Sequence, residues 1–176
     1  MSCCPVNMEP ARATAPASRA IRTYGSTKLF VSGPAKAKAG VLSLPDIFGI
    51  DSGRIQQDAE ALGKLGYAVV VVDAASGDYK TPKTRVTCPG EDAPAHSVPQ
   101  LLLSAGNDPE FVREGGSLEK ILKAKADIGA QCEVVDFPDV IHGWVNRSDL
   151  ENPVNKAAVM KAWHAAVKFT QTVNPL

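Results

Sequence analysis

An unbroken apolar run, Ala68 to Val72 (AVVVV), follows a segment with helical periodicity. A strand that is apolar at every position is typical of a parallel sheet, in which both faces of the strand are buried. The helix predicted before it spans Ser52 to Leu65, and the serine can cap its first turn. The short apolar segment Gly40 to Leu44 (GVLSL) predicts a strand before that helix. The sequence therefore predicts two parallel strands joined by a helix, the βαβ unit.

The same alternation of strand and helix runs through the rest of the chain. Short apolar runs bounded by Gly, Pro or polar residues predict strands, and apolar residues at helical spacing predict helices. The further strands are predicted at Lys28 to Ser32, Gln100 to Ser104 and Glu133 to Phe137, and the further helices at Ser117 to Ile128 and Pro153 to Thr172. This order predicts an α/β fold with a mainly parallel sheet and flanking helices.

Two segments depart from this pattern. Residues 1–24 contain many Ala, Ser and Arg residues and are predicted to form an N-terminal arm; organelle transit peptides have a similar composition. Residues 25–176 are predicted to form the α/β domain. Inside that domain, Ala74 to Val98 is dense in Pro, Gly, Asp and Thr and has no periodicity. So long an irregular link is unusual in a compact domain and indicates that the fold is altered there.

Charge and cysteine content exclude several classes of protein. The 176 residues contain 19 Lys and Arg and 19 Asp and Glu, so the formal net charge is zero and gives no electrostatic reason to bind nucleic acid or a membrane surface. No apolar run approaches the ~20 residues of a spanning helix. The four cysteines include no C-x-x-C pair, so neither a metal site nor a disulfide framework is predicted. We therefore expect a soluble, cytoplasmic protein without a metal ion.

Several residues that could carry chemistry come directly after predicted strands, where ligands bind in parallel α/β sheets. They are Asp46, Asp73, Asp78, Asp108 and His142. An acid followed by a histidine, each after a strand, is the order in which α/β-hydrolases supply the last two members of their triad. The acid would hold the imidazole in one tautomer while the histidine moves a proton for a nucleophile.

Each member of this pair also has a simpler interpretation. His142 could be a half-buried histidine with an ordinary hydrogen-bond partner, although it lies in a turn after a strand with Trp144 nearby as a possible pocket wall. Asp108 could cap a turn, because it follows Gly-Asn and precedes Pro. Both interpretations stay open on the residues alone.

Four motifs, in this order along the chain, resemble those of a known family. They are DIFGI at Asp46 to Ile50, GYAVVVVD at Gly66 to Asp73, SAGND at Ser104 to Asp108 and HGW at His142 to Trp144. The chain resembles the dienelactone hydrolase family of α/β-hydrolases, in particular its eukaryotic branch. The resemblance implies hydrolysis of a small-molecule carboxylic ester or lactone by a Cys, His and Asp triad, without a metal or organic cofactor.

The resemblance also assigns roles to individual residues. His142 would be the general base and acid, and Asp108 its orienting partner. The backbone N–H of Ile47 would donate to the oxyanion. Asp46 falls where many bacterial members have a Glu that interacts with the resting thiol. Arg147 falls near an arginine that binds the substrate carboxylate, a task suited to a guanidinium.

The nucleophile of the family has no counterpart in this chain. Neither G-x-C-x-G nor G-x-S-x-G occurs in the sequence, and the link near residues 80–98 is much shorter than in the family, so the central strands of the sheet are expected to be deleted. Cys88 lacks an apolar strand before it, and Pro89 has no N–H to serve as an oxyanion donor. Closing the sheet would require Ala68 to Val72 to pair directly with Gln100 to Ser104, with part of a sheet face left uncovered.

The sequence therefore predicts a dienelactone-hydrolase-family protein whose hydrolysis is impaired. One alternative is a non-catalytic module that binds a small molecule or a protein through a retained pocket edge, formed by Asp46, Trp144 and Arg147. Another is a chain that self-associates to cover its bare sheet face.

Overall fold

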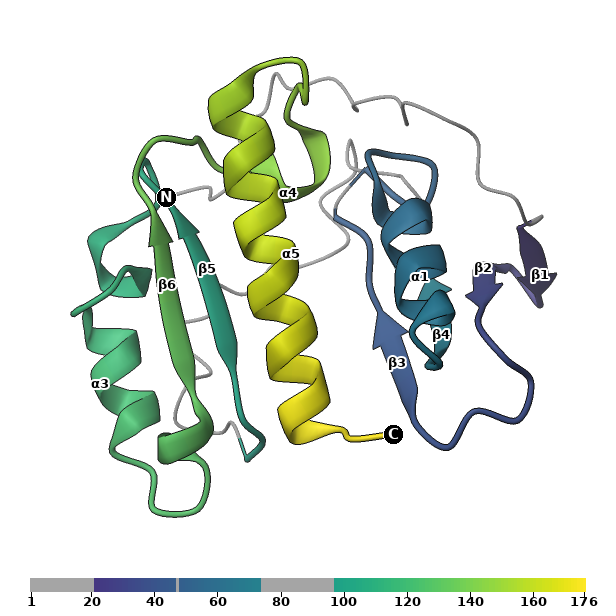
Figure 1. Cartoon of the computed structure of the whole chain (residues 1–176), viewed down its shortest axis with the longest axis horizontal. Helices are drawn as coiled ribbons and strands as arrows, with labels where there is room; N and C mark the ends of the chain where they lie inside the picture. The colour runs from purple at the N-terminus through teal and green to yellow at the C-terminus, as the bar shows by residue number, and fades with distance from the viewer. Residues whose placement is uncertain (1–20, 47, 74–96) are drawn as a thin grey trace. The chain divides into compact units, whose positions relative to one another are not determined.

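The computed structural model of the chain describes residues 21–46, 48–73 and 97–176 (Figure 1). These residues belong to two compact units. The N-terminal unit contains the described residues up to 73 together with Asn174–Leu176, and the C-terminal unit contains residues 97–173. Each unit has its own sheet and its own hydrophobic core.

In the described residues, the N-terminal unit consists of a four-stranded sheet and one helix. The elements are β1 (Arg22–Tyr24), β2 (Thr27–Ser32), β3 (Gly40–Ser43), α1 (Ile55–Lys64) and β4 (Ala68–Val72). The strand order is β1-β2-β4-β3. The pairs β1 with β2 and β2 with β4 are antiparallel, whereas β3 and β4 are parallel and α1 lies between them in the chain. The predicted βαβ unit is therefore confirmed.

The two faces of this sheet differ in burial. The face packed against α1 holds the core, whose buried members are Phe30, Ile50, Ala59, Tyr67, Val69 and Val71. Side chains alternate along a strand, so the residues between these point to the opposite face. On that face the Leu42 side chain is 69% exposed, and Val31 and Val70, which pair across β2 and β4, are only partly buried. Among the described residues of this unit, no helix packs on this face, which presents apolar side chains.

The last residues of the chain bind to the N-terminal unit. The Tyr67 hydroxyl donates a hydrogen bond to the carbonyl of Asn174 at 3.1 Å, and the Asn174 side-chain amide donates to the carbonyl of Gly40 at 2.9 Å. These two bonds fix the C-terminal residues beside β3 and β4.

A pair of parallel strands between helices forms the C-terminal unit. The elements are β5 (Leu101–Ala105), the 3-10 helix η2 (Glu110–Val112), α3 (Ser117–Lys123), the 3-10 helix η3 (Gly129–Gln131), β6 (Glu133–Phe137), α4 (Trp144–Arg147) and α5 (Pro153–Val173). Leu102 packs with the buried side chains of α3, whereas Leu103 and Val135 pack with Ala162 of α5. Because adjacent residues of a strand point to opposite faces, α3 and α5 cover opposite faces of the β5 and β6 pair (Figure 1).

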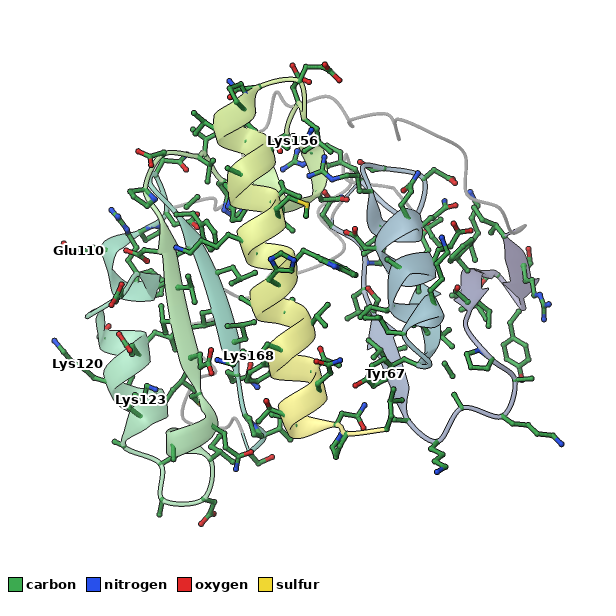
Figure 2. All side chains as sticks on the ribbon, viewed as in Figure 1. Tyr67, Glu110, Lys120, Lys123, Lys156 and Lys168 are labelled. Atoms are coloured by element: carbon green, nitrogen blue, oxygen red, sulfur yellow. The ribbon has the colours of Figure 1, made fainter. Side chains whose placement is uncertain are left out.

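Helix α3 illustrates how its sequence sets its orientation. Leu118 and Leu122, four residues apart, are almost completely buried against the sheet. Lys120, on the other side of the helix, points away from the sheet (Figure 2). The Lys123 ammonium donates a hydrogen bond to the carbonyl of Cys132, which ties the end of the helix to the start of β6.

Most predicted elements are confirmed with small shifts at their ends. The strands at Ala68–Val72 and Glu133–Phe137 have the predicted bounds, and the last helix ends one residue later than predicted, at Val173. Helix α3 ends at Lys123 instead of Ile128, because the chain turns so that Ile128 joins the buried cluster of α3. The link at Ala74 to Val98 lies almost wholly outside the described residues.

The predicted pairing of Ala68 to Val72 with Gln100 to Ser104 is wrong. Both edges of β4 are occupied, one by β2 and the other by β3, so β4 has no free edge for a further strand. In the described residues β5 pairs with β6 alone. Among the described residues, the four-stranded sheet is mixed, with two antiparallel pairs and one parallel pair, whereas the β5–β6 sheet is parallel. The expectation of a mainly parallel sheet therefore holds only in part.

Two further expectations differ from the structure. Ser52 does not cap α1: the helix starts at Ile55, its N-cap residue is Arg54, and Ser52 is buried in the turn before it. Strand β1 lies inside the predicted arm, residues 1–24, because Arg22–Tyr24 pair with β2 in a hairpin. Residues 1–20 of the arm lie outside the described residues.

Candidate active site

The structure brings Asp108 and His142 together within the C-terminal unit. Asp108 lies in the turn that follows β5, and His142 lies in the turn that follows β6. Because β5 and β6 are parallel neighbours, both turns lie at the same edge of the sheet. The His142 Nδ1 atom is 2.6 Å from Asp108 Oδ1, and the side chains are 39% and 13% exposed, respectively.

Backbone bonds hold the Asp108 carboxylate in this position. Its second oxygen, Oδ2, accepts a hydrogen bond from the N–H of Ala105 at 2.7 Å, and the N–H of Asp108 donates to the carbonyl of Ala105 at 3.0 Å. Gly106 donates to the carbonyl of Val140 at 2.9 Å, which joins this turn to the turn that carries His142. A side chain at Gly106 would collide with the carbonyl of Pro138, so the close approach of the two turns requires glycine.

The pair has the geometry of a proton-transfer site. A carboxylate can only accept hydrogen bonds, so a neutral His142 bonded to Asp108 must carry its proton on Nδ1. The lone pair then lies on Nε2, which makes no hydrogen bond to any residue that the structure describes. An imidazole held in this tautomer and partly exposed can accept a proton from a bound group and return it.

A second charged group, Asp136 on β6, supports the turn that carries Asp108. Its carboxylate accepts hydrogen bonds from the Ser104 hydroxyl and from the N–H of Glu114 at 3.0 Å, and forms an ion pair with Arg113 at 3.3 Å. Burial would raise the pKa of Asp136, but these hydrogen bonds and the Arg113 charge outweigh it and lower the pKa. Arg113 also donates to the carbonyl of Gly106 at 3.4 Å.

Sequence reasoning missed Asp136, because an Asp inside a strand usually reads as a solvent-facing residue. It also missed Asn107, whose side-chain oxygen accepts a hydrogen bond from the N–H of His142 at 2.6 Å. The Gly-Asn-Asp sequence gave a turn signal, but nothing in it indicates a bond to a residue far along the chain.

Arg147 packs against Gly143, the residue that follows His142 in the chain. It ends the short helix α4, and its guanidinium folds back over Gly143, the residue after His142. Gly143 has a φ of +86°, a left-handed conformation that glycine adopts without strain. The guanidinium of the predicted carboxylate-binding arginine therefore lies over the backbone of the residue that follows His142.

Trp144 lies in the core of the C-terminal unit. Its ring is 4% exposed and packs on Phe137, with the ring centroids 4.4 Å apart. Its indole therefore supports the turn that holds His142, and most of its surface is turned toward the core.

The two remaining predicted residues belong to the other part of the chain. Asp46 is in the N-terminal unit, where its Oδ1 accepts the N–H of Phe48 at 3.0 Å. Ile47, the predicted oxyanion donor, and Cys88 lie outside the described residues. Cys132 is 1% exposed in the α3 cluster and so cannot act as a nucleophile in this state.

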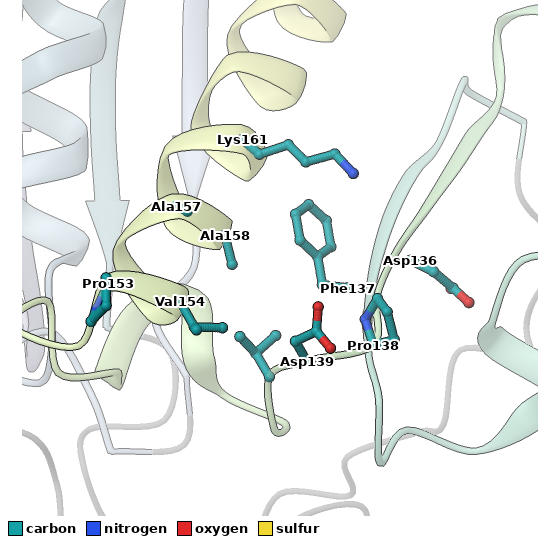
Figure 3. A pocket seen from close by; sticks show the side chains of 10 residues that line it. Asp136, Phe137, Pro138, Asp139, Pro153, Val154, Ala157, Ala158 and Lys161 are labelled. Carbon is teal, nitrogen blue, oxygen red and sulfur yellow. The ribbon is translucent and has the colours of Figure 1, made fainter.

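A hollow of about 470 Å³ lies elsewhere in the C-terminal unit, between the turn after β6 and the first turns of α5 (Figure 3). Its lining is mainly apolar, and the Lys161 ammonium lies 5.0 Å from the centre of the Phe137 ring. Neither Asp108 nor His142 lines this hollow. Within the described residues, no group of three or more His, Cys, Asp or Glu could hold a metal ion.

An acid and a histidine on neighbouring turns at the carboxyl edge of parallel strands have the arrangement in which α/β-hydrolases carry these two residue types. The chain belongs to the dienelactone hydrolase family, whose model matches residues 72–174, more than half of its length. The match contains both turns of the site.

A curated relative gives a more limited comparison. An endo-1,3;1,4-beta-D-glucanase from Zea mays is 36% identical over 63 residues, which make up 36% of this chain and 21% of the relative. The matched part thus spans about a fifth of the relative's length. No solved structure matches the chain. None of the helices in the described residues has the length and apolar character that crossing a membrane requires.

Proposed function

We propose that this hydrolase-family chain retains the base and the acid of a carboxylic ester or lactone hydrolase, while its own hydrolysis is impaired by the lack of a nucleophile. The observation that carries the proposal is the 2.6 Å contact between His142 Nδ1 and Asp108 Oδ1, together with the absence of G-x-C-x-G from the sequence. The substrate class is a small-molecule ester or lactone.

The proposed chemistry divides between the residues as follows. His142 takes the proton of the attacking group on Nε2 and returns it to the leaving group, while Asp108 holds the tautomer and stabilises the imidazolium. Such proton transfer contributes typically about 10²- to 10⁴-fold to a rate. It cannot replace covalent attack, because splitting acyl transfer into two steps needs a thiolate or alkoxide aligned with the base.

The pocket edge has proposed roles of its own. The Arg147 guanidinium, which folds over Gly143, binds a carboxylate of the substrate. The resemblance to the family further implies that the N–H of Ile47 would donate to the oxyanion and that Asp46 would take the place of the thiol-binding Glu. Trp144 supports the turn that holds His142. No metal or organic cofactor takes part in the proposed reaction.

The proposal is tested by hydrolysis of an activated aryl ester and of a lactone by the purified chain, with Cys88→Ala and His142→Ala as variants. We expect turnover that is barely above the buffer rate and that changes little in either variant. Robust turnover that both substitutions abolish would overturn the claim of impaired hydrolysis.

The missing nucleophile segment has a separate test. We propose that it is absent through an internal deletion near residues 80–98, arising by splicing, through the gene model or in the gene itself. Genomic and transcript sequence around the codons for Tyr79 to Val98 distinguishes these origins. A segment encoding G-x-C-x-G in an adjoining intron would identify a longer form of the protein with a complete triad, whereas continuous coding sequence would make the deletion genuine.

The second candidate function is a non-catalytic module that binds a small carboxylate. The Arg147 guanidinium, which folds over Gly143, the residue after His142, favours it, because a guanidinium suits a carboxylate. Calorimetric titration with benzoate is the test, with Arg147→Ala as the variant and Arg22→Ala, an exposed arginine of β1, as the control. Saturable binding lost only in Arg147→Ala, without hydrolysis, would favour this function over an enzyme.

A further inference from the structure

Three consecutive residues of the turn after β5 each bind the turn after β6. The N–H of Gly106 donates to the carbonyl of Val140 at 2.9 Å, and the side-chain oxygen of Asn107 accepts the N–H of His142 at 2.6 Å. Asp108 then contacts the imidazole of the same histidine at 2.6 Å. His142 is therefore held twice, at its backbone by Asn107 and at its ring by Asp108.

We propose that Asn107 is a positioning residue for His142, because its side-chain oxygen fixes the backbone from which the imidazole reaches Asp108. This role rests on the proton-transfer function proposed for His142. Asn107 has no part in moving the proton. It fixes the backbone position of His142, from which the imidazole ring extends.

The neighbours of His142 provide little anchoring through their side chains. The Ile141 side chain is 65% exposed, and Gly143 has no side chain and a φ of +86°. Glycine lowers the barrier to backbone motion on one side of the histidine. Without the bond from Asn107, the ring bond to Asp108 would be the main direct tie on His142, and displacement of a catalytic group by about 1 Å can cost about 100-fold in rate.

The bond differs from ordinary turn chemistry. An Asn in a turn commonly bonds its own backbone two residues further on. The Asn107 oxygen instead reaches a residue 35 positions away, on the turn of the neighbouring strand. A residue that only shaped its own turn would have no need of this partner.

The test is nuclear magnetic resonance of the full chain labelled with ¹⁵N, so it needs no enzymatic activity. In the natural chain we expect His142 to carry its proton on Nδ1 and that proton to exchange slowly with water. Asn107→Ala should speed this exchange at least tenfold, whereas Asn107→Asp keeps an acceptor oxygen at the same place and should stay close to the natural rate. The matched control is Asp139→Ala, an exposed residue of the same turn as His142 without a hydrogen bond to a described residue.

The outcomes separate this proposal from the proposed function. A natural chain whose His142 lacks the Nδ1 proton would overturn the pairing with Asp108, and with it the function. A natural chain with that proton, and an Asn107→Ala variant that keeps the natural exchange rate, would overturn the positioning role alone. If Asn107→Ala does not fold, the natural chain decides: the backbone N–H of His142 must exchange at least tenfold more slowly than that of Ile141, and equal rates would overturn the proposal.

Discussion

Gly143 is the residue at which the backbone of the site and its arginine meet. Its φ of +86° is left-handed, and a side chain there would collide with the guanidinium of Arg147. Left-handed backbone costs an ordinary residue about 1–2 kcal/mol. The end of an arginine side chain can swing away, so the collision displaces Arg147 without adding much to the free-energy cost of the conformation.

We therefore predict that Gly143→Ala lowers the free energy of unfolding of the C-terminal unit by about 1 kcal/mol. The matched control is Gly115→Ala, since Gly115 has a φ of +78° and no atom within 4 Å of the position a side chain would take. Chemical denaturation followed by tryptophan fluorescence reports this unit, because both tryptophans, Trp144 and Trp163, lie in it. The two variants should lose similar stability, while only Gly143→Ala should change the ¹⁵Nε resonance of Arg147. An unchanged Arg147 resonance would contradict the packing of the guanidinium over Gly143.

The positions of strands and helices depend mainly on local sequence pattern, and these were predicted well. The strands Ala68–Val72 and Glu133–Phe137 have their predicted bounds, because a run of β-branched residues ends at Asp73 in the first and Pro138 closes the second. The pairing of β4 was not predictable in the same way, because a strand's neighbours depend on residues far away in the chain. The burial of Ser52 and the hydrogen bond from the N–H of His142 to the Asn107 side chain also depend on tertiary contacts. The local sequence therefore predicted a serine cap that does not form and did not indicate the role proposed for Asn107.

The two units should respond differently to acid, because the pKa of a partly buried carboxyl of α1 and that of the supporting carboxyl of β6 are shifted in opposite directions. Burial raises the pKa of Asp58 to about 6, against the opposing charge of Arg54. The folded N-terminal unit thus binds more protons than the unfolded chain between about pH 4 and pH 6, and its stability falls as the pH rises through this range, by up to about 3 kcal/mol. The pKa of Asp136 is lowered, so the stability it contributes is lost only as the pH falls below about 4.

Hydrogen exchange measured by mass spectrometry at pH 5 and pH 7, corrected for intrinsic rates, checks this prediction. Peptides covering β4 should be more protected at pH 5, and the difference should vanish in Asp58→Asn. Asp51→Asn, at a residue of the same unit whose side chain is 62% exposed, should keep it. The protection of peptides covering β5 should not differ between pH 5 and pH 7 on account of Asp136, because the lowered pKa keeps this carboxyl ionised at both values. A pH difference in β4 that persists in Asp58→Asn would contradict the assignment.

At the scale of the whole molecule, the sheet of the N-terminal unit has an apolar face that α1 does not cover. Leu42 and Leu44 are 69% and 61% exposed, and strand β3 is an edge of the four-stranded sheet that the described residues form. Segment Gly40–Leu44 contains no charged residue, although charged side chains are a common means of blocking sheet edges from pairing with another chain. An edge of this kind favours association.

We predict that the chain self-associates as its concentration rises and that Leu42→Lys reduces this association. Leu65→Lys is the control, because Leu65 is also exposed in this unit but follows α1 instead of lying on β3. Sedimentation velocity over a hundredfold range of concentration is the measurement. A natural chain that stays monomeric throughout would rule out association through this face.

The central claim is that the chain has the base and the acid of a hydrolase but lacks its nucleophile. The most direct test measures the burst of p-nitrophenol that is released when the chain is mixed with excess p-nitrophenyl acetate. A working triad acylates once per molecule before steady turnover begins, so the burst counts functional nucleophiles. We predict a burst far below one equivalent per chain, no acyl adduct by intact mass, and the same result for Cys88→Ala. A burst of one equivalent, lost in both Cys88→Ala and His142→Ala, would show that the chain has a complete triad and would contradict the proposed function.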